Sequence, residues 1–376
     1  MGPKSWPCRG LKGACTGSGV ATTCTQNPQA IPRPWHFVHQ GETLAYLAGI
    51  VDGDGYFKVA RAYRTPGTVH PYYATIVGVQ QLWPSDAVSL FAAVFGGTLT
   101  GPERTPGSRP MARCEVRGAK ADSAARHLLP FLLLKKAQAL LLLEVETLRH
   151  HRRGRPRPGE AVHVEMETVR QALLALHTGS WRPAAPLPLD FSLKGYQRLS
   201  PNELGWSRAE LLAYLAGIID SDGNLRAEKR RVRDMRGPHF RINIRCSQVI
   251  PSPAVELLTE TFGGRLGLRK ASRPNHRDLV SWSLHDKAAA QAVEALLPHL
   301  RVKWLEAHLL LELMALKARG KQGVTIWRHR TRWQRPIRMQ KRCYTADQNA
   351  EFERIHRAVQ ALHAGGAKRP AVIESE

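Results

Sequence analysis

The chain has 376 residues, enough for two domains of ordinary size that each bury a hydrophobic core. Its 55 Lys+Arg against 31 Asp+Glu give a formal net charge of +24, and a surplus that repels itself so strongly indicates a polyanionic partner, nucleic acid first. The sequence lacks a membrane-spanning apolar run, a phosphate-binding G-K-[S/T] loop and C-x-x-C zinc spacing among its six cysteines. It therefore predicts no membrane partner, no nucleotide hydrolysis, and cysteines that stay reduced.

The N-terminal segment, residues 1–40, precedes the first acidic residue, Glu42. It carries lysines and arginines among Gly, Pro, Ser and Thr, a composition that predicts a disordered basic extension. An acid-free basic segment is also typical of an organelle transit peptide, as against a dispensable tail. A chloroplast or mitochondrion is therefore one candidate compartment.

The rest of the chain is internally duplicated. Leu44–Gly55 reads LAYLAGIVDGDG, and Leu212–Gly223, 168 residues later, reads LAYLAGIIDSDG. The similarity continues downstream at offsets of 167 to 168, through the pairs Gln81 and Gln248, Pro84-Ser85 and Pro251-Ser252, Phe95-Gly-Gly97 and Phe262-Gly-Gly264, and Lys135 and Lys303. Two copies are too few for a solenoid, so this is a duplicated domain.

Each copy predicts the order αββαββα, so the expected fold class is α+β with two pseudo-symmetric domains and antiparallel sheets. After each motif helix we expect two strands, over Tyr56–Arg64 and Tyr72–Gln81 and over Asn224–Asp234 and Phe240–Val249. A helix follows in each copy, over Ser85–Phe95 and Pro253–Phe262, and each ends at Gly-Gly. Two shorter strands and leucine-rich helices complete the copy.

The predicted domains cover residues 41–150 and 206–317. Residues 151–205 are basic and proline-rich around one amphipathic helix and suit a linker. Residues 318–376 form a basic C-terminal extension that ends in a helix. The two trailing helices resemble each other over Val169–His177 and Ile355–His363.

The motif helices have two unusual features. Small residues at helical spacing, Gly49 and Gly217 among them, would allow two helix backbones to pack closely. Each helix then ends in two acids before a glycine stop, although helix C-termini favour cations. The acids are Asp52 and Asp54, and Asp220 and Asp222. Bringing four carboxylates together requires cations, and divalent metals with oxygen ligands can supply that charge and assist phosphodiester hydrolysis.

The sequences LAGIVDGDG and LAGIIDSDG resemble the signature of the LAGLIDADG homing endonucleases, in the monomeric two-motif form. The resemblance covers about residues 40–150 and 206–317, and it implies saddle-shaped sheets. It also implies that Asp54 and Asp222 are catalytic metal ligands and that the carbonyls of Gly53 and Ser221 face the metal. Asp52, Asp220, Gly49 and Gly217 would be structural parts of the motif.

By the same resemblance Gln81 and Gln248 belong to an active-site water network, and Lys135 and Lys303 polarise it. The residues themselves leave alternatives open. A glutamine at a strand end is also typical of a solvated position, and a lysine after an apolar helix start is typical of a solvated face.

The basic residues of the first two strands in each copy predict the DNA contacts. Antiparallel strands can enter a major groove, where arginine and glutamine edges read bases. The candidate residues are Lys58, Arg61, Arg64, Arg226, Lys229, Arg231, Arg233, Arg241 and Arg245. Because the copies differ, the target should be asymmetric. Residues 317–342, with ten Lys/Arg, no acid and interleaved tryptophans, predict a further nucleic-acid contact.

The expected function is site-specific double-strand DNA cleavage by a monomer with Mg²⁺ or Mn²⁺, in the service of intron homing. The alternative is an RNA maturase that assists group I intron splicing on the same fold, with intron RNA as its partner. A DNA-binding regulator without catalysis fits less well, because both candidate metal-binding acids are present.

Overall fold

The computed structural model describes residues 40–63, 71–103, 109–150, 160–178, 201–231, 238–271, 277–320, 322–328 and 337–364. The predicted N-terminal extension lies outside these residues, except for Gln40. None of the described helices combines the length and apolar character needed to cross a membrane.

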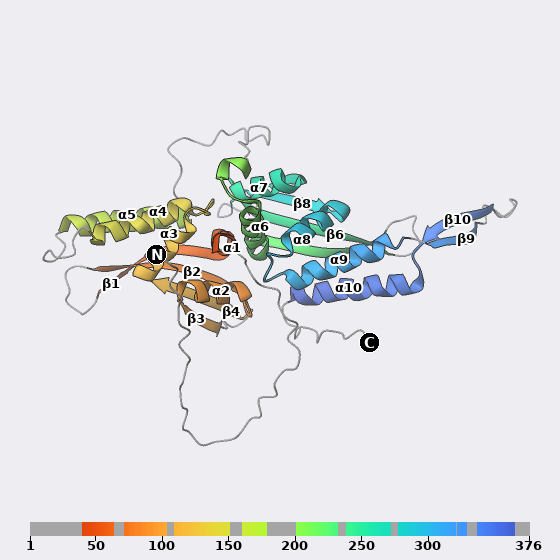
Figure 1. Cartoon of the computed structure of the whole chain (residues 1–376), viewed down its shortest axis with the longest axis horizontal. Helices are drawn as coiled ribbons and strands as arrows, with labels where there is room; N and C mark the ends of the chain where they lie inside the picture. Colours follow the sequence, from red (N-terminus) through yellow and green to blue (C-terminus); the bar gives the residue numbers. More distant parts are fainter. Residues whose placement is uncertain are drawn as a thin grey trace, which may run out of the picture. The chain divides into compact units, whose positions relative to one another are not determined.

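The first copy has the predicted order of elements (Figure 1). It consists of α1 (Gln40–Asp54), β1 (Gly55–Ala62), β2 (Tyr72–Leu82), α2 (Asp86–Phe95), β3 (Thr98–Glu103), β4 (Met111–Arg117), α3 (Ala119–Leu128) and α4 (Lys136–His150). The second copy repeats it as α6 (Arg208–Asp222), β5 (Gly223–Arg231), β6 (Pro238–Val249), α7 (Pro253–Phe262), β7 (Arg265–Arg269), β8 (Leu279–His285), α8 (Asp286–Leu296) and α9 (Trp304–Ala318). A short 3₁₀ turn, η1 (Pro201–Leu204), precedes α6.

The two sheets are antiparallel and equivalent, with strand orders β1-β2-β4-β3 and β5-β6-β8-β7. Burial alternates along β1, β4 and β8, as period-2 side-chain geometry requires. In β1 the side chains of Phe57 and Val59 are buried, whereas Lys58 between them is exposed. One face of each sheet therefore packs on the core, and the opposite face carries polar and charged residues. The α+β class and the duplicated αββαββα order are confirmed.

Helix starts follow from local hydrogen bonds. Ser207 caps α6 in the predicted capping box with Glu210. Ser85 and Ser252 cap α2 and α7 by accepting from the backbone N–H groups of Val88 and Val255.

The two motif helices end at the predicted glycines, Gly55 and Gly223, but without a left-handed glycine cap. Gly223 has an extended backbone, not a left-handed one, and begins β5 directly. A Cβ at Gly223 would lie 2.5 Å from the carbonyl oxygen of Ile219, and one at Gly55 would lie 2.6 Å from the Cα of Val51. The glycines are required because the chain turns back tightly against the last helical turn, so the reason is steric crowding at Cβ.

Helices α1 and α6 lie side by side (Figure 1), and their glycines are the points of closest approach. A Cβ at Gly49 would lie 2.3 Å from the carbonyl oxygen of Tyr214, and a Cβ at Gly217 would lie 2.3 Å from that of Tyr46. The helices thus pack backbone to backbone, as the small residues predict. The surrounding apolar residues of both copies form one continuous core.

A further helix covers the edge strand of each sheet. Helix α5 (Glu160–Thr178) packs on α4 and β1, and α10 (Ala346–Ala364) packs on α9 and β5. Nε2 of His177 is 2.7 Å from the carbonyl oxygen of Phe57, and Nε2 of His363 is 2.7 Å from that of Leu225. The helix of the predicted linker and the C-terminal helix are therefore equivalent parts of the two copies. Each covers backbone groups of an edge strand that would otherwise invite pairing.

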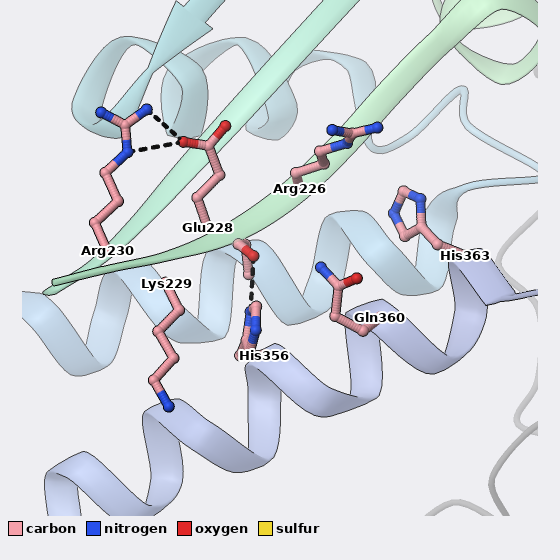
Figure 2. Close-up of a pocket in the computed structure, with 8 residues that line it drawn as sticks. Arg226, Glu228, Lys229, Arg230, His356, Gln360 and His363 are labelled. Carbon is pink, nitrogen blue, oxygen red and sulfur yellow. Dashed lines mark hydrogen bonds and ion pairs between the residues drawn. The ribbon is translucent and has the colours of Figure 1, made fainter. Parts of the chain in front are cut away.

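Figure 2 shows this cover in the second copy. Nδ1 of His356, on α10, is 2.8 Å from the carbonyl oxygen of Ala227 on β5. Lys229 extends from the strand toward α10 and forms an ion pair with Glu353. The first copy has the corresponding ion pair, in which Arg61 Nη1 lies 4.0 Å from Glu167 Oε2.

Between α9 and α10 the chain forms a hairpin that the first copy lacks among its described residues. Its strands are β9 (Gln322–Arg328) and β10 (Ile337–Cys343), paired antiparallel. The hairpin belongs to the basic segment 317–342.

Candidate active site

The last acid of each motif brings a carboxylate to the point where α1 and α6 end together. A Cβ at Gly53 would lie 2.0 Å from Ser221 Oγ and 3.1 Å from Asp222 Oδ2, so the two motif ends adjoin. Burial raises the pKa of Asp54, and the nearby charge of Asp222 raises it further. Two like charges held this close favour cation binding.

The other two acids, Asp52 and Asp220, are buried, each only 3% exposed. Tyr214 on α6 donates its hydroxyl to Asp52 at 2.8 Å, and Tyr46 on α1 donates to Asp220 at 2.8 Å. Each carboxylate also accepts three backbone N–H groups from the residues just before a later helix. Asp52 accepts from Leu133, Leu134 and Lys135 before α4, and Asp220 accepts from Arg301, Val302 and Lys303 before α9. Asp52 and Asp220 therefore tie the helix pair together and fix the segments that carry the two lysines.

The two lysines turn back onto the C-terminal ends of the motif helices. Lys135 Nζ donates to the carbonyl oxygens of Val51 (2.8 Å), Gly53 (3.0 Å) and Gly55 (2.8 Å). Lys303 Nζ donates to those of Ile219 (2.7 Å), Asp220 (2.6 Å) and Ser221 (3.4 Å). The two ammonium groups offset the partial negative charge at the C-terminal ends of the motif helices, to which the acids add further negative charge. Burial lowers the pKa of Lys135, while the carboxylates of Asp52, Asp222 and Asp54 oppose that shift.

The two glutamines are hydrogen-bonded to the site acids. Gln81 Nε2 donates to Asp54 Oδ2 at 2.8 Å, and Gln248 Nε2 donates to Asp222 Oδ2 at 2.9 Å. Gln81 and Gln248 are only 6% and 7% exposed, so the solvated alternative does not describe them. Each binds one carboxylate oxygen and leaves the other oxygen of that acid for another ligand.

Two serines orient the glutamines, and neither was among the predicted site residues. Ser85 Oγ donates to Gln81 Oε1 at 2.6 Å, and Ser252 Oγ donates to Gln248 Oε1. Because the amide oxygen accepts from the serine, the amide nitrogen must face the acid. The repeated Pro-Ser pairs were the available sequence signal, but they predicted only a helix start. The repeated tyrosines of LAYLAG, Tyr46 and Tyr214, were likewise missed as partners of the buried acids.

The donor set can accommodate divalent cations. The described residues hold no group of three or more His, Cys, Asp or Glu side chains around one point. They do bring together the carboxylates of Asp54 and Asp222 and the carbonyl oxygens of Gly53 and Ser221, each of which accepts from a lysine and keeps a second lone pair. Oxygen ligands of this kind suit Mg²⁺ or Mn²⁺, which complete their coordination with water and phosphate oxygens.

The predicted DNA-contacting residues differ in where their side chains lie. Lys58, Arg226 and Arg245 are exposed on the sheet faces turned away from the core. Arg61 and Lys229 lie instead on the strand faces that meet α5 and α10, where they form the ion pairs with Glu167 and Glu353. Arg241 is paired with Asp286 at 3.5 Å. Three predicted contacts lie outside the described residues, namely Arg64, Arg233 and the side chain of Arg231.

The sequence matches no family model and no curated protein. The structure does resemble solved structures of homing endonucleases. I-SmaMI bound to cleaved DNA is 12% identical, with a TM-score of 0.55, over 87% of this chain and 97% of that one. I-GzeII in complex with its DNA target is 13% identical, with a TM-score of 0.54, over 84% of this chain and 97% of that one. I-AabMI bound to uncleaved DNA is 13% identical, with a TM-score of 0.53, over 84% of this chain and 98% of that one. The chain therefore has the two-copy fold of the LAGLIDADG homing endonucleases.

Proposed function

We propose that this chain is a site-specific DNA endonuclease that hydrolyses both strands of a long asymmetric target with Mg²⁺ or Mn²⁺. The observation that carries the proposal is the duplicated unit at the helix ends. In each copy a serine orients a glutamine, the glutamine binds the last acid of the motif, and a lysine binds the carbonyls beside it. Two such units fit a duplex whose two strands are cut at adjacent positions.

Each residue has a defined part in this proposal. Asp54 and Asp222, with the carbonyls of Gly53 and Ser221, would hold the cations, whose chemistry when bound is to lower the pKa of a water and stabilise the leaving oxygen. Lys135 and Lys303 keep those carbonyls aimed at the site and place positive charge where the phosphate must lie. The fold relatives support a DNA partner, because I-SmaMI, I-GzeII and I-AabMI were crystallised with DNA. I-SmaMI has also been crystallised with its uncleaved target in the presence of calcium ions.

The remaining parts of the proposal follow from charge. Lys58, Arg226 and Arg245 would contact DNA from the open sheet faces. The β9–β10 hairpin, with the basic residues of 317–342 around it, would add a phosphate contact outside the two sheets. The two copies together supply a complete site, so the active species would be a monomer.

A cleavage selection from a randomised DNA library, run with Mg²⁺, with Mn²⁺ and with EDTA, tests the proposal. We expect one long asymmetric sequence to be enriched among the cut products, only when the cation is present. A chain that binds a selected sequence and leaves it uncut with either cation, while Asp54→Asn alters nothing, would contradict it.

A further inference from the structure

A row of four residues crosses the open face of the first sheet beside the candidate active site. Tyr56 on β1 lies opposite Gly78 on β2, Gly78 lies opposite Glu115 on β4, and Glu115 lies opposite Thr98 on β3. Tyr56 comes two residues after Asp54 in the chain. The row is therefore next to the point where we propose that DNA is cut.

Gly78 makes room for the ring of Tyr56 across β2. A Cβ at Gly78 would lie 2.4 Å from Tyr56 Cζ and 2.5 Å from its hydroxyl oxygen. The ring can consequently cross β2, and the Tyr56 hydroxyl donates to Glu115 Oε1 on β4 at 2.6 Å. The absence of a side chain at position 78 is what allows this contact.

Arg113 on β4 is held in place by this arrangement. Its Nε donates to the Tyr56 hydroxyl oxygen at 2.9 Å, and its Nη2 forms an ion pair with Glu115. Its guanidinium also lies 5.6 Å from the centre of the Tyr56 ring. Two of the five N–H groups are used in this way, and three remain. The side chain is 36% exposed, so a ligand on the open face of the sheet can reach it.

Glu115 is the fixed anion of the cluster. Burial opposes its charge, but hydrogen bonds from Tyr56, Arg117 and Arg113 prevail and lower its pKa to about 2. Arg117 donates to its second oxygen at 2.7 Å. A carboxylate on a DNA-facing surface weakens attraction to phosphates. Its presence here is better explained by the orientation it gives to Arg113 than by backbone binding.

The second sheet has a different row at the equivalent place. Asn224 lies opposite Arg245, Arg245 opposite Ser283, and Ser283 opposite Arg265. Arg245 stands where the first sheet has Gly78, and a serine replaces Glu115. Arg245 and Arg265 are exposed and have no hydrogen-bond partner within the described part of the chain. Among the described residues, the equivalent place in the second sheet therefore lacks the Tyr-Glu-Arg cluster, and Arg226 is instead hydrogen-bonded to Asn224.

We propose that Arg113 is a specificity-determining residue that reads a guanine beside the cleaved position, in the half of the target bound by the first sheet. The inference rests on the proposed endonuclease function. An arginine fork matches O6 and N7 of guanine in the major groove, and a fork that is already oriented loses less side-chain entropy on binding. Tyr56 and Glu115 are positioning residues that act through Arg113.

A DNA-binding selection with Ca²⁺ as the only divalent cation tests this inference on the full-length chain. The variants are Arg113→Lys, which keeps the charge but loses the fork, and Tyr56→Phe, which loses only the orienting hydroxyl. Arg265→Lys is the matched control from the other copy. We expect the wild type to enrich guanine at one base pair near the centre of the site. Arg113→Lys should lower that preference about tenfold, Tyr56→Phe should lower it less at the same base pair, and Arg265→Lys should leave that base pair unchanged.

Two results would overturn the inference while the endonuclease proposal stands. Arg113→Lys could select the same bases as the wild type, or it could weaken binding equally for all sequences, which is the behaviour of a phosphate contact. If the wild-type chain enriches no sequence at all, the result contradicts the proposed site-specific function, and the proposal that Arg113 reads a guanine is then contradicted as well.

Discussion

At the scale of single residues, the carboxylate of Asp54 is held in an unfavourable environment. Burial raises its pKa, and Asp222 adds to the rise. A raised native pKa means that the folded state binds protons more readily than the unfolded state, so ionisation of Asp54 opposes folding as the pH rises above the ordinary range of an aspartate. Retention of a charge that opposes folding is typical of a functional site.

We therefore predict that Asp54→Asn raises the Tm at pH 7, because the variant has no charge to desolvate and can still accept from Gln81. The gain should shrink as the pH falls through the raised pKa of Asp54 toward the ordinary aspartate value, where the wild type is itself protonated. Thermal unfolding of both chains across that pH range measures the difference. An Asp54→Asn chain that is less stable than the wild type at pH 7 would be inconsistent with this account.

Ser85 links a helix cap to the site. It caps α2 and donates to Gln81, which binds Asp54. Ser85→Ala should cost about 1 kcal/mol of stability, the usual value of an N-cap. It should also lower cleavage about tenfold, because the freed amide no longer holds the acid in place. Ser89→Ala is the control, since Ser89 is exposed on the same helix and donates only to the Ser85 carbonyl oxygen. Equal cleavage by the two variants would show that Ser85 does not orient the site.

At the scale of elements, the contact between α1 and α6 decides whether the two acids meet. Gly217→Ala would place a Cβ 2.3 Å from the carbonyl oxygen of Tyr46 and 3.1 Å from the Cα of Gly49. Neither atom can move without separating the helices, so we expect a loss of about 1–3 kcal/mol in the free energy of unfolding. Gly267→Ala on exposed β7 approaches only the Ser281 hydroxyl and should change stability by less than about 0.5 kcal/mol. Denaturant unfolding compares the two, and equal effects would refute the close-contact explanation.

The element order was predictable because the duplication supplied each pattern twice. The strands of the first copy end close to the predicted bounds, and α7 spans the predicted residues. The cover of the edge strands by α5 and α10 was not predictable. Its signal, the repeated segment ending in His177 and His363, indicates a helix but not the strand carbonyls that these histidines contact. Contacts of that kind join distant parts of the chain and have no local periodicity.

The candidate site was predicted in part. Repetition showed that the acids, the glutamines and the lysines occupy equivalent positions in the two copies, and the resemblance to the LAGLIDADG family implied their roles. It did not reveal that Lys135 and Lys303 bind the helix-end carbonyls, since hydrogen-bond partners about 80 residues apart depend on how the helices pack. The tyrosines that reach across to the opposite helix were hidden in an apolar motif, where an aromatic residue ordinarily indicates core.

At the scale of the whole molecule, the two copies share one core, and Asp54 and Asp222 lie where α1 and α6 end together. If Asp54 and Asp222 bind divalent ions, Ca²⁺ should stabilise the folded wild type by mass action. We predict a Tm that rises with Ca²⁺ concentration for the wild type. The Asp54→Asn, Asp222→Asn double variant should show no such rise. Calorimetric scans of both chains over a Ca²⁺ series make the comparison, and parallel responses would place the cations elsewhere.

We propose above that Asp54 and Asp222 perform metal-dependent cleavage on a bound DNA duplex. The most direct test measures the rate of cutting of one selected duplex with Mg²⁺, together with the Kd for that duplex. The chains compared are the wild type, Asp54→Asn, Asp222→Asn and, as an exposed-acid control, Asp278→Asn. We predict that each of the two site variants cuts at least about 100-fold more slowly than the wild type, with little change in Kd, and that the control cuts normally. If both site variants bind the duplex with the wild-type Kd and also cut it at the wild-type rate, Asp54 and Asp222 are not the catalytic acids.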